Sequence, residues 1–168
     1  MTGPSPEFSR PLRVDRVPKL GSTEKIEADP AERTALAKRL EIPALHGLSA
    51  KLRATPWRGG GLQLDGAVEA DLEQVSVVSL ELFRHSVAFP VLRYFLPPGR
   101  EAEADEEEID VIENGIVDLG EVVAEALALE LDPYPRRPGE AFDDQPAPEV
   151  EEKPPSPFAA LSRLHRKE

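Results

Sequence analysis

The sequence lacks cysteine and has no long hydrophobic run, and each absence excludes a class of protein. Without cysteine, disulfides and thiolate metal sites are impossible, and nothing points to an oxidising compartment. No apolar run approaches the length that a membrane span needs, and residues 1–7 lack the basic stretch and apolar core of a signal peptide. We therefore expect a cytoplasmic protein with no membrane association.

Positive charge is also scarce, because the formal net charge is −12. Residues 1–100 hold 14 Lys/Arg against 12 Asp/Glu, whereas residues 101–168 hold 6 against 20. This balance disfavours a general nucleic-acid binder, since phosphate affinity comes largely from Lys and Arg. A local basic face on the first hundred residues remains open, and the acidic part suits a basic protein partner equally well.

Motifs that carry chemistry are missing as well. His46, His85 and His165 lie in separate segments without the spacing of a metal site, and the glycines at 59–61 lack the Lys-Ser/Thr of a phosphate loop. We predict no catalysis, metal, cofactor or small-molecule substrate. The rival hypothesis is a hydrolase-like enzyme that uses the acidic loop at Asp105 and residues 106–108.

Proline, with 18 residues, bounds the folded part, because prolines cluster near the N-terminus and after residue 131. We expect one α+β domain with flexible ends. The expected segments are a flexible N-terminus at 1–6, the domain at 7–139 with an acidic loop near 100–108, a disordered Pro- and acid-rich linker at 140–156, and a short amphipathic segment at 157–168.

Period-two alternation predicts the strands of this domain. A first strand is expected over 8–14, and a long hairpin on either side of the turn at 55–61. His46, Leu48, Ala50 and Leu52 share one face before the turn, and even positions from Leu62 to Leu72 share one face after it. The alternation slips near 73–78, where we expect a bulge. Further strands are predicted over 86–95 and 109–112.

Capping signals predict two helices. Asp29-Pro30-Ala31-Glu32 starts one that ends near Leu40, and Asp118-Leu119-Gly120-Glu121 starts another that runs to Leu131. Two helices are too few for a doubly wound fold. We predict a twisted antiparallel sheet or partial barrel with both helices packed on it.

Lys51 and Arg53 have two interpretations. They form a candidate RNA patch on the solvent face of the hairpin, but Asp65, Glu69, Asp71 and Glu73 on the second strand are expected to pair with them. Exposed charges usually belong to such a solvated, paired face.

Four stretches together resemble the YceD family, in its alphaproteobacterial form. They are residues 7–12, residues 28–33, residues 117–139 with the run Asp-Pro-Tyr-Pro-Arg, and residues 157–161. The resemblance implies a bacterial protein that supports accumulation of large-subunit ribosomal RNA without an established enzymatic activity. Its expected partner is ribosomal RNA or a basic large-subunit ribosomal protein, and we expect a monomer. Many relatives carry cysteines where Ser76 and Ser79 stand here, so any metal or redox role of those cysteines is absent.

The prolines after the second helix predict a stiff, extended arm that carries Tyr134, Arg136 and Arg137. A tyrosine that stacks on an unpaired base and two guanidinium groups that hold phosphates would make an RNA contact. The alternative is that Tyr134 covers the end of the helix and the arginines pair with nearby acids. Phe158 and Leu161, in the C-terminal amphipathic segment, complete the candidate binding residues.

Overall fold

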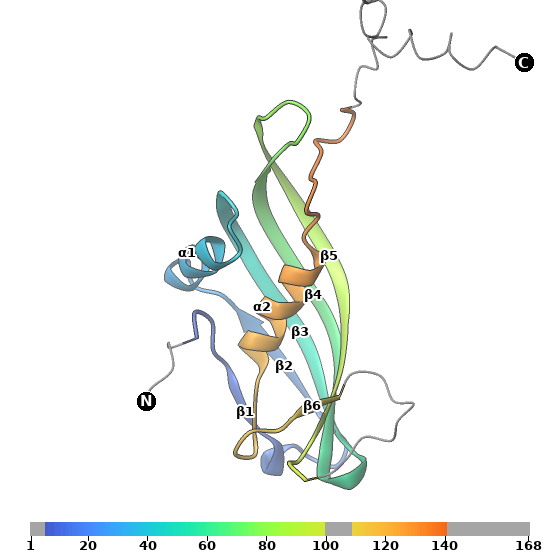
Figure 1. The fold of residues 1–168 in the computed structure, drawn as a ribbon. Coiled ribbons are helices and arrows are strands. Elements are labelled where there is room, and N and C mark those ends of the chain that lie inside the picture. The colour runs from blue at the N-terminus through green and yellow to red at the C-terminus, as the bar shows by residue number, and fades with distance from the viewer. Residues whose placement is uncertain (1–5, 100–108, 141–168) are drawn as a thin grey trace, which may run out of the picture. The chain divides into compact units, whose positions relative to one another are not determined.

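The computed structural model describes residues 6–99 and 109–140 and places one open, twisted sheet at the centre of the fold (Figure 1). The strand order is β2-β3-β4-β5-β6. The strands are β2 (Ser22–Glu27), β3 (Ala44–Trp57), β4 (Gly61–Val75), β5 (Leu82–Leu96) and β6 (Ile109–Val111). A second, two-stranded sheet joins β1 (Pro11–Arg13) to β7 (Ile116–Asp118), and 3-10 turns cover Val14–Arg16 and Arg58–Gly60.

Strands β3, β4 and β5 form a long antiparallel meander whose alternation decides which face is buried. Even positions of β4 and odd positions of β5 point to the same side, since Val68 lies opposite Phe89. Their apolar side chains form the core with those of β3. The buried strand residues include Leu48, Leu52, Leu62, Leu64, Val68, Leu72, Phe89, Val91 and Phe95.

Both helices contribute to this one core and therefore cover the same face of the sheet (Figure 1). Helix α1 (Pro30–Arg39) starts with the predicted capping box between Asp29 and Glu32. Helix α2 (Leu119–Glu130) starts at Asp118, whose carboxylate accepts hydrogen bonds from the backbone N–H groups of Gly120 and Glu121. The opposite, outward face is called the open face below, because it carries exposed or half-buried side chains.

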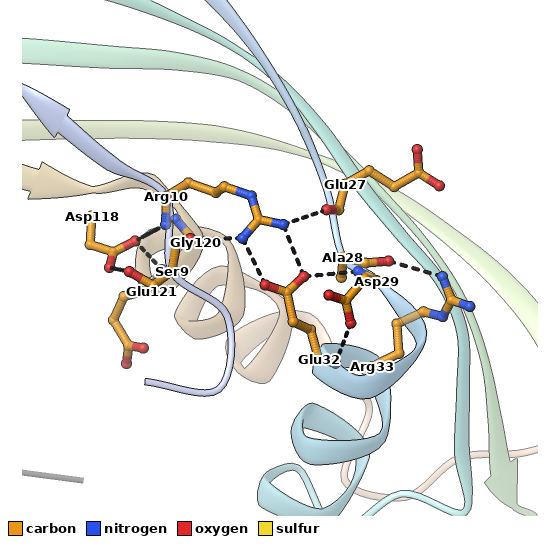
Figure 2. A network of polar contacts seen from close by, with 10 residues as sticks. All are labelled: Ser9, Arg10, Glu27, Ala28, Asp29, Glu32, Arg33, Asp118, Gly120 and Glu121. Carbon is orange, nitrogen blue, oxygen red and sulfur yellow. Dashed lines mark hydrogen bonds and ion pairs between the residues drawn. The ribbon is translucent and has the colours of Figure 1, made fainter. Parts of the chain in front are cut away.

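A polar network ties the N-terminal segment to both helices (Figure 2). The Arg10 guanidinium donates to both carboxylate oxygens of Glu32, at 2.7 and 2.9 Å, and to the Glu27 carbonyl at 2.9 Å. The Arg10 backbone N–H and the Ser9 hydroxyl both donate to Asp118, at 2.7 and 2.5 Å. One short segment thereby fixes the start of α1 and the start of α2.

The two long predicted strands and both helices are confirmed, but the first strand is shorter than predicted. Only Pro11–Arg13 of the expected 8–14 strand pairs, with β7, while Phe8 is buried outside any strand. Strand β2 was not predicted, because its sequence STEKIE is short and mostly polar and gives little alternation.

The bulge lies elsewhere than predicted. Strand β4 keeps its register with β5 through Val75, and the register instead shifts between Leu45 and Gly47 on β3. This shift reverses the phase of the alternation, so Leu45 is buried and His46 is exposed. The prediction that His46 shares a face with Leu48 is therefore wrong.

The sheet is also not purely antiparallel. Strand β6 pairs with the end of β5 in parallel, Tyr94 opposite Ile109. The predicted strand at 109–112 is confirmed in place, but the segment 100–108 that decides its direction lies outside the described residues. Of the expected flexible N-terminus at 1–6, linker at 140–156 and amphipathic segment at 157–168, all but residues 6 and 140 lie outside them too. In the described part, no helix is long and apolar enough to cross a membrane.

A first prediction concerns the close approach of α2 to the N-terminal segment. A Cβ added at Gly120 would lie 2.4 Å from the Phe8 carbonyl oxygen, whereas one added at Gly47 would meet nothing nearer than 3.7 Å. We expect Gly120→Ala to lower the free energy of unfolding by about 1–3 kcal/mol, because backbone must move. Gly47→Ala, the matched control, should change it by less than about 1 kcal/mol. Urea unfolding measures both, and equal effects would contradict the packing.

A second prediction concerns pH. The hydrogen bonds from Arg10 hold the pKa of Glu32 below its usual range, although partial burial acts in the other direction. A carboxyl with a lowered pKa stabilises the fold above its unfolded pKa of about 4.3, and this contribution is lost as the pH falls through the folded value. Glu32→Gln should thus be less stable than wild type at pH 7, with the gap narrowing towards pH 3. A gap that stays constant in urea titrations would refute this.

Candidate nucleic-acid interface

The segment after α2 is an arm, Asp132–Pro138, held against the far end of the β4–β5 hairpin. The Gln74 side chain donates to the Asp132 carbonyl at 3.2 Å, and the Val77 N–H donates to the Pro135 carbonyl at 2.9 Å. The Asp132 carboxylate accepts from the Tyr134 N–H at 2.8 Å. These bonds position the arm through its backbone.

Tyr134 is exposed by 71% on this anchored arm. It does not cover the core, so the alternative in which the ring packs over the end of the helix is not what the structure shows. Arg136 is exposed, while Arg137 forms an ion pair with Glu81 at 2.9 Å and also donates to the Leu82 carbonyl. Arg137 thus helps to fasten the arm to the hairpin.

The hairpin end beside the arm, residues 75–82, carries a set of exposed apolar side chains, of which Leu80 is exposed by 78%. The set is Val75, Val77, Leu80 and Leu82. Sequence reasoning missed this surface, although five large apolar residues within an eight-residue segment were a visible signal. Exposed apolar residues that gather in one place favour a binding role.

The turn itself depends on Ser76. Its buried hydroxyl accepts hydrogen bonds from the backbone N–H groups of Val78 and Ser79, at 3.1 and 3.4 Å. Its backbone bonds to Glu81 and Leu80 close the turn, and Leu80 has a φ of 61°. The hydroxyl of Ser76 therefore has a structural function here.

A cleft of about 850 Å³ opens next to the arm, between the end of α1 and the end of α2. Its walls are largely apolar, with Ile42 and Pro43 on one side and Leu131 and Pro133 on the other. The cleft and the exposed hairpin end place accessible apolar surface next to the arm that carries Tyr134.

A pair of aromatic rings, Trp57 and Tyr94, lies on the open face at the end of the sheet opposite to the arm. Trp57 and Tyr94 contact each other with ring centroids 4.8 Å apart, and the Arg58 guanidinium lies 4.5 Å from the Trp57 centroid. Both rings are half-buried. They already have partners for their faces, which makes them poorer stacking platforms than Tyr134.

Lys51 and Arg53 lie on the open face of the sheet, and the structure does not bring them together with the arm. Arg53 is directly opposite Asp65, as expected, but Lys51 is opposite Ala67 on one side and Lys25 on the other. Two of the four acids expected to pair with them have other partners: Asp71 binds Arg84 and Glu73 binds His46. The register explains this, because it offsets the charges of β3 from those of β4.

The remaining predicted residues are dispersed or lie outside the described part. Phe158, Leu161, His165 and the acidic loop at 101–108 fall outside it. His46 lies on β3 and His85 on β5, with different partners: Glu73 for the first and a stacked Phe83 for the second. Within residues 6–99 and 109–140, no three His, Asp or Glu side chains gather as metal ligands do.

Fold and site define an α+β protein with both helices on one sheet face and an aromatic arm beside a projecting hairpin. The chain belongs to the YceD family: the family model described as "Large ribosomal RNA subunit accumulation protein YceD" matches residues 64–165, more than half of the chain. That description names a role in ribosomal RNA accumulation and no reaction. Neither the curated proteins nor the solved structures contain a match to this chain.

The match confirms the predicted family membership, and it includes two of the four stretches that suggested this family. The stretches at 117–139 and 157–161 lie inside the matched range, whereas those at 7–12 and 28–33 lie before it. In the structure the stretch at 7–12 nevertheless bonds both to the start of α2, through Arg10 and Asp118, and to the stretch at 28–33, through Arg10 and Glu32 (Figure 2). The N-terminal part is thus packed as part of the same core.

A third prediction tests the structural role of Ser76. Ser76→Ala leaves two backbone N–H groups of the turn without their acceptor, so we expect a loss of about 1–3 kcal/mol in the free energy of unfolding. Ser79 is exposed, and Ser79→Ala should cost clearly less. Chemical unfolding of the two variants gives the comparison, and a Ser76→Ala protein as stable as wild type would contradict the assignment.

Proposed function

We propose that this protein is a ribosome-biogenesis factor that supports accumulation of large-subunit ribosomal RNA by binding rather than by catalysis, and that its arm contacts unpaired RNA. The family supports the first part. The second rests on one observation: Tyr134 is an exposed aromatic ring on an arm that hydrogen bonds already hold in place.

Physical chemistry favours such a site for unpaired bases. A base that stacks on an exposed aromatic ring gains about 1–3 kcal/mol, and every base offers a face for it. Because the backbone of the arm is already ordered, little conformational entropy is lost on binding. Arg136, two residues further along, supplies the charge for a neighbouring phosphate, and Arg137 keeps the arm in position through Glu81.

The acidity of the chain makes this contact a local one. With a net charge of −12, broad phosphate binding is unfavourable, so only the cations of the arm contribute. Neutralising about one phosphate of a single strand, at Arg136, gives a slope of roughly −0.7 for log K against log salt. We therefore expect weak salt dependence, unlike that of a basic RNA-binding protein.

Two alternatives from the sequence differ from this proposal: a protein as direct partner, and an enzyme. A basic large-subunit ribosomal protein as direct partner would suit the acidic C-terminal half, and an enzyme would need the carboxylates at 101–108. We also expect the protein to act as a monomer in the cytoplasm, where ribosomes are assembled. What copurifies after nuclease treatment separates the two partners: loss of all partners favours RNA, and a retained ribosomal protein favours that protein as the direct partner.

A fourth prediction tests the arm. Tyr134→Ala and Arg136→Ala together should leave the free energy of unfolding within about 0.5 kcal/mol, because both residues are exposed. Sedimentation of pre-50S particles should show at least tenfold weaker association of this variant, since the stacking and one phosphate contact are lost. Leu20→Ala removes another exposed apolar side chain, away from the arm, and is the control. Normal cosedimentation of a folded double variant would remove these residues from the site.

The role in the cell has its own test. Deleting the gene should lower the 50S peak of a sucrose gradient and the ratio of large- to small-subunit RNA. Wild type should restore both, and the double variant should restore neither. An unchanged gradient in the deletion strain would overturn the proposed role itself, whereas full rescue by the variant would overturn only the arm.

A further inference from the structure

The outer edge of β5 is unpaired over most of its length. Among the described residues, β6 pairs only with Tyr94, Phe95 and Leu96. On the side of β5 that faces away from β4, no described strand pairs with the stretch from Leu82 to Arg93. Figure 1 shows this stretch of β5 extending past the short β6 along the margin of the sheet. An unpaired strand edge is a row of backbone donors and acceptors that another extended segment can join.

The structure shows which residues present this row. The Leu96 carbonyl accepts from Ile112 on the β6 side, and the Leu82 carbonyl accepts from Arg137, so even positions direct their backbone groups away from β4. The register with β4 is unbroken between Leu82 and Phe95. The donors at the edge are therefore Arg84, Ser86, Ala88 and Leu92. Pro90 has no N–H, and it lies at an even position, where none is needed for the pairing with β4.

Beside this edge the open face carries small side chains and the carboxylates of Glu27, Glu69 and Asp71. Lys25 and Lys51 line the adjoining hollow together with Glu27 and Glu69. One row of directly opposed residues crosses the open face: Glu27 on β2, Ser49 on β3, Glu69 on β4 and Ala88 on β5. A groove of about 320 Å³ follows this row and the next, from Ser86 and Ala88 at the edge to Glu27. In the described part of the chain, neither Glu27 nor Glu69 has a cation within ion-pair distance, whereas Asp71 in the same groove binds Arg84.

We propose that the β5 edge binds an extended, Lys- or Arg-bearing segment of a partner protein by adding it as a further strand, with a basic side chain over Ala88 that reaches Glu69. Strands lie about 4.8 Å apart, so the added residue and Glu69 are roughly 10 Å apart at the backbone, within the combined reach of the two side chains. Arg84 on β5 already donates a hydrogen bond to Asp71 on the neighbouring strand β4. The small side chains of Ser86 and Ala88 leave the path free.

Protein is favoured over RNA at this edge for two reasons. Backbone donors and acceptors in a row match another polypeptide backbone, which is the basis of strand addition. The carboxylates of the groove repel phosphate and attract ammonium or guanidinium groups. The proposal is independent of the RNA contact by the arm.

A labelled ten-residue peptide of alternating Lys and Val is the probe, with a Glu and Val peptide as control. We expect the Lys peptide to bind the full chain at least tenfold more tightly and to slow hydrogen exchange at Arg84, Ser86, Ala88 and Leu92. Two further peptides carry backbone N-methyl groups on alternate residues, either on every Lys or on every Val. One of them should lose binding at least tenfold and the other should keep it, because only one set of N–H groups faces the edge.

Charge variants test the groove without changing the strand. Glu69→Lys should weaken binding of the Lys peptide at least tenfold, while Glu130→Lys, the same charge change on the exposed end of α2, should not. Three results would overturn the proposal. The first is equal affinity of the two methylated peptides. The others are slow hydrogen exchange of the four edge amides in the protein without peptide, at any protein concentration, and slowed exchange of these amides on addition of single-stranded RNA.

Discussion

The Arg10 guanidinium, bound to Glu32 and to the Glu27 carbonyl, is the contact on which the arrangement of the fold depends. Glu32 also closes the capping box of α1, so the same carboxylate starts a helix and receives the N-terminal segment. Asp118 does the same for α2, because it caps that helix and accepts from Ser9 and Arg10. Two capping acids and one arginine thereby join segments that are more than a hundred residues apart.

This constraint places both helices on one side of the sheet, and no helix among the described residues covers the other side. The ion pair of Arg39 with Glu121 adds a direct link between the two helices. Because the helices and the N-terminal segment occupy the inner face, what remains accessible is the open face, the β5 edge and the hairpin end with its arm. The candidate binding surfaces lie where the core does not reach.

Local patterns predicted those parts of the fold that depend on nearby residues. The caps at Asp29 and Asp118 and the even-numbered alternation from Leu62 to Leu72 all appear as expected. The features that were missed depend on distant partners: β2 is a strand because it pairs with β3, and the bulge at Leu45 reverses a phase that alternation alone cannot reveal. The exposure of Tyr134 likewise depends on Gln74 and Val77, which hold the arm. The candidate site was therefore predictable as an arm with an aromatic and two arginines, and one of the two interpretations included the pairing with an acid that Arg137 makes. The position of the arm was not predictable.

We propose that the arm contacts large-subunit RNA and that the β5 edge binds protein. Ultraviolet cross-linking of the protein in pre-50S particles, followed by mass spectrometry of the nucleotide-bearing peptides, tests this division most directly. We expect the principal cross-linked peptide to contain Tyr134. Nucleotide cross-links on Lys51, Arg53 or the β5 edge, with none on the arm, would contradict it.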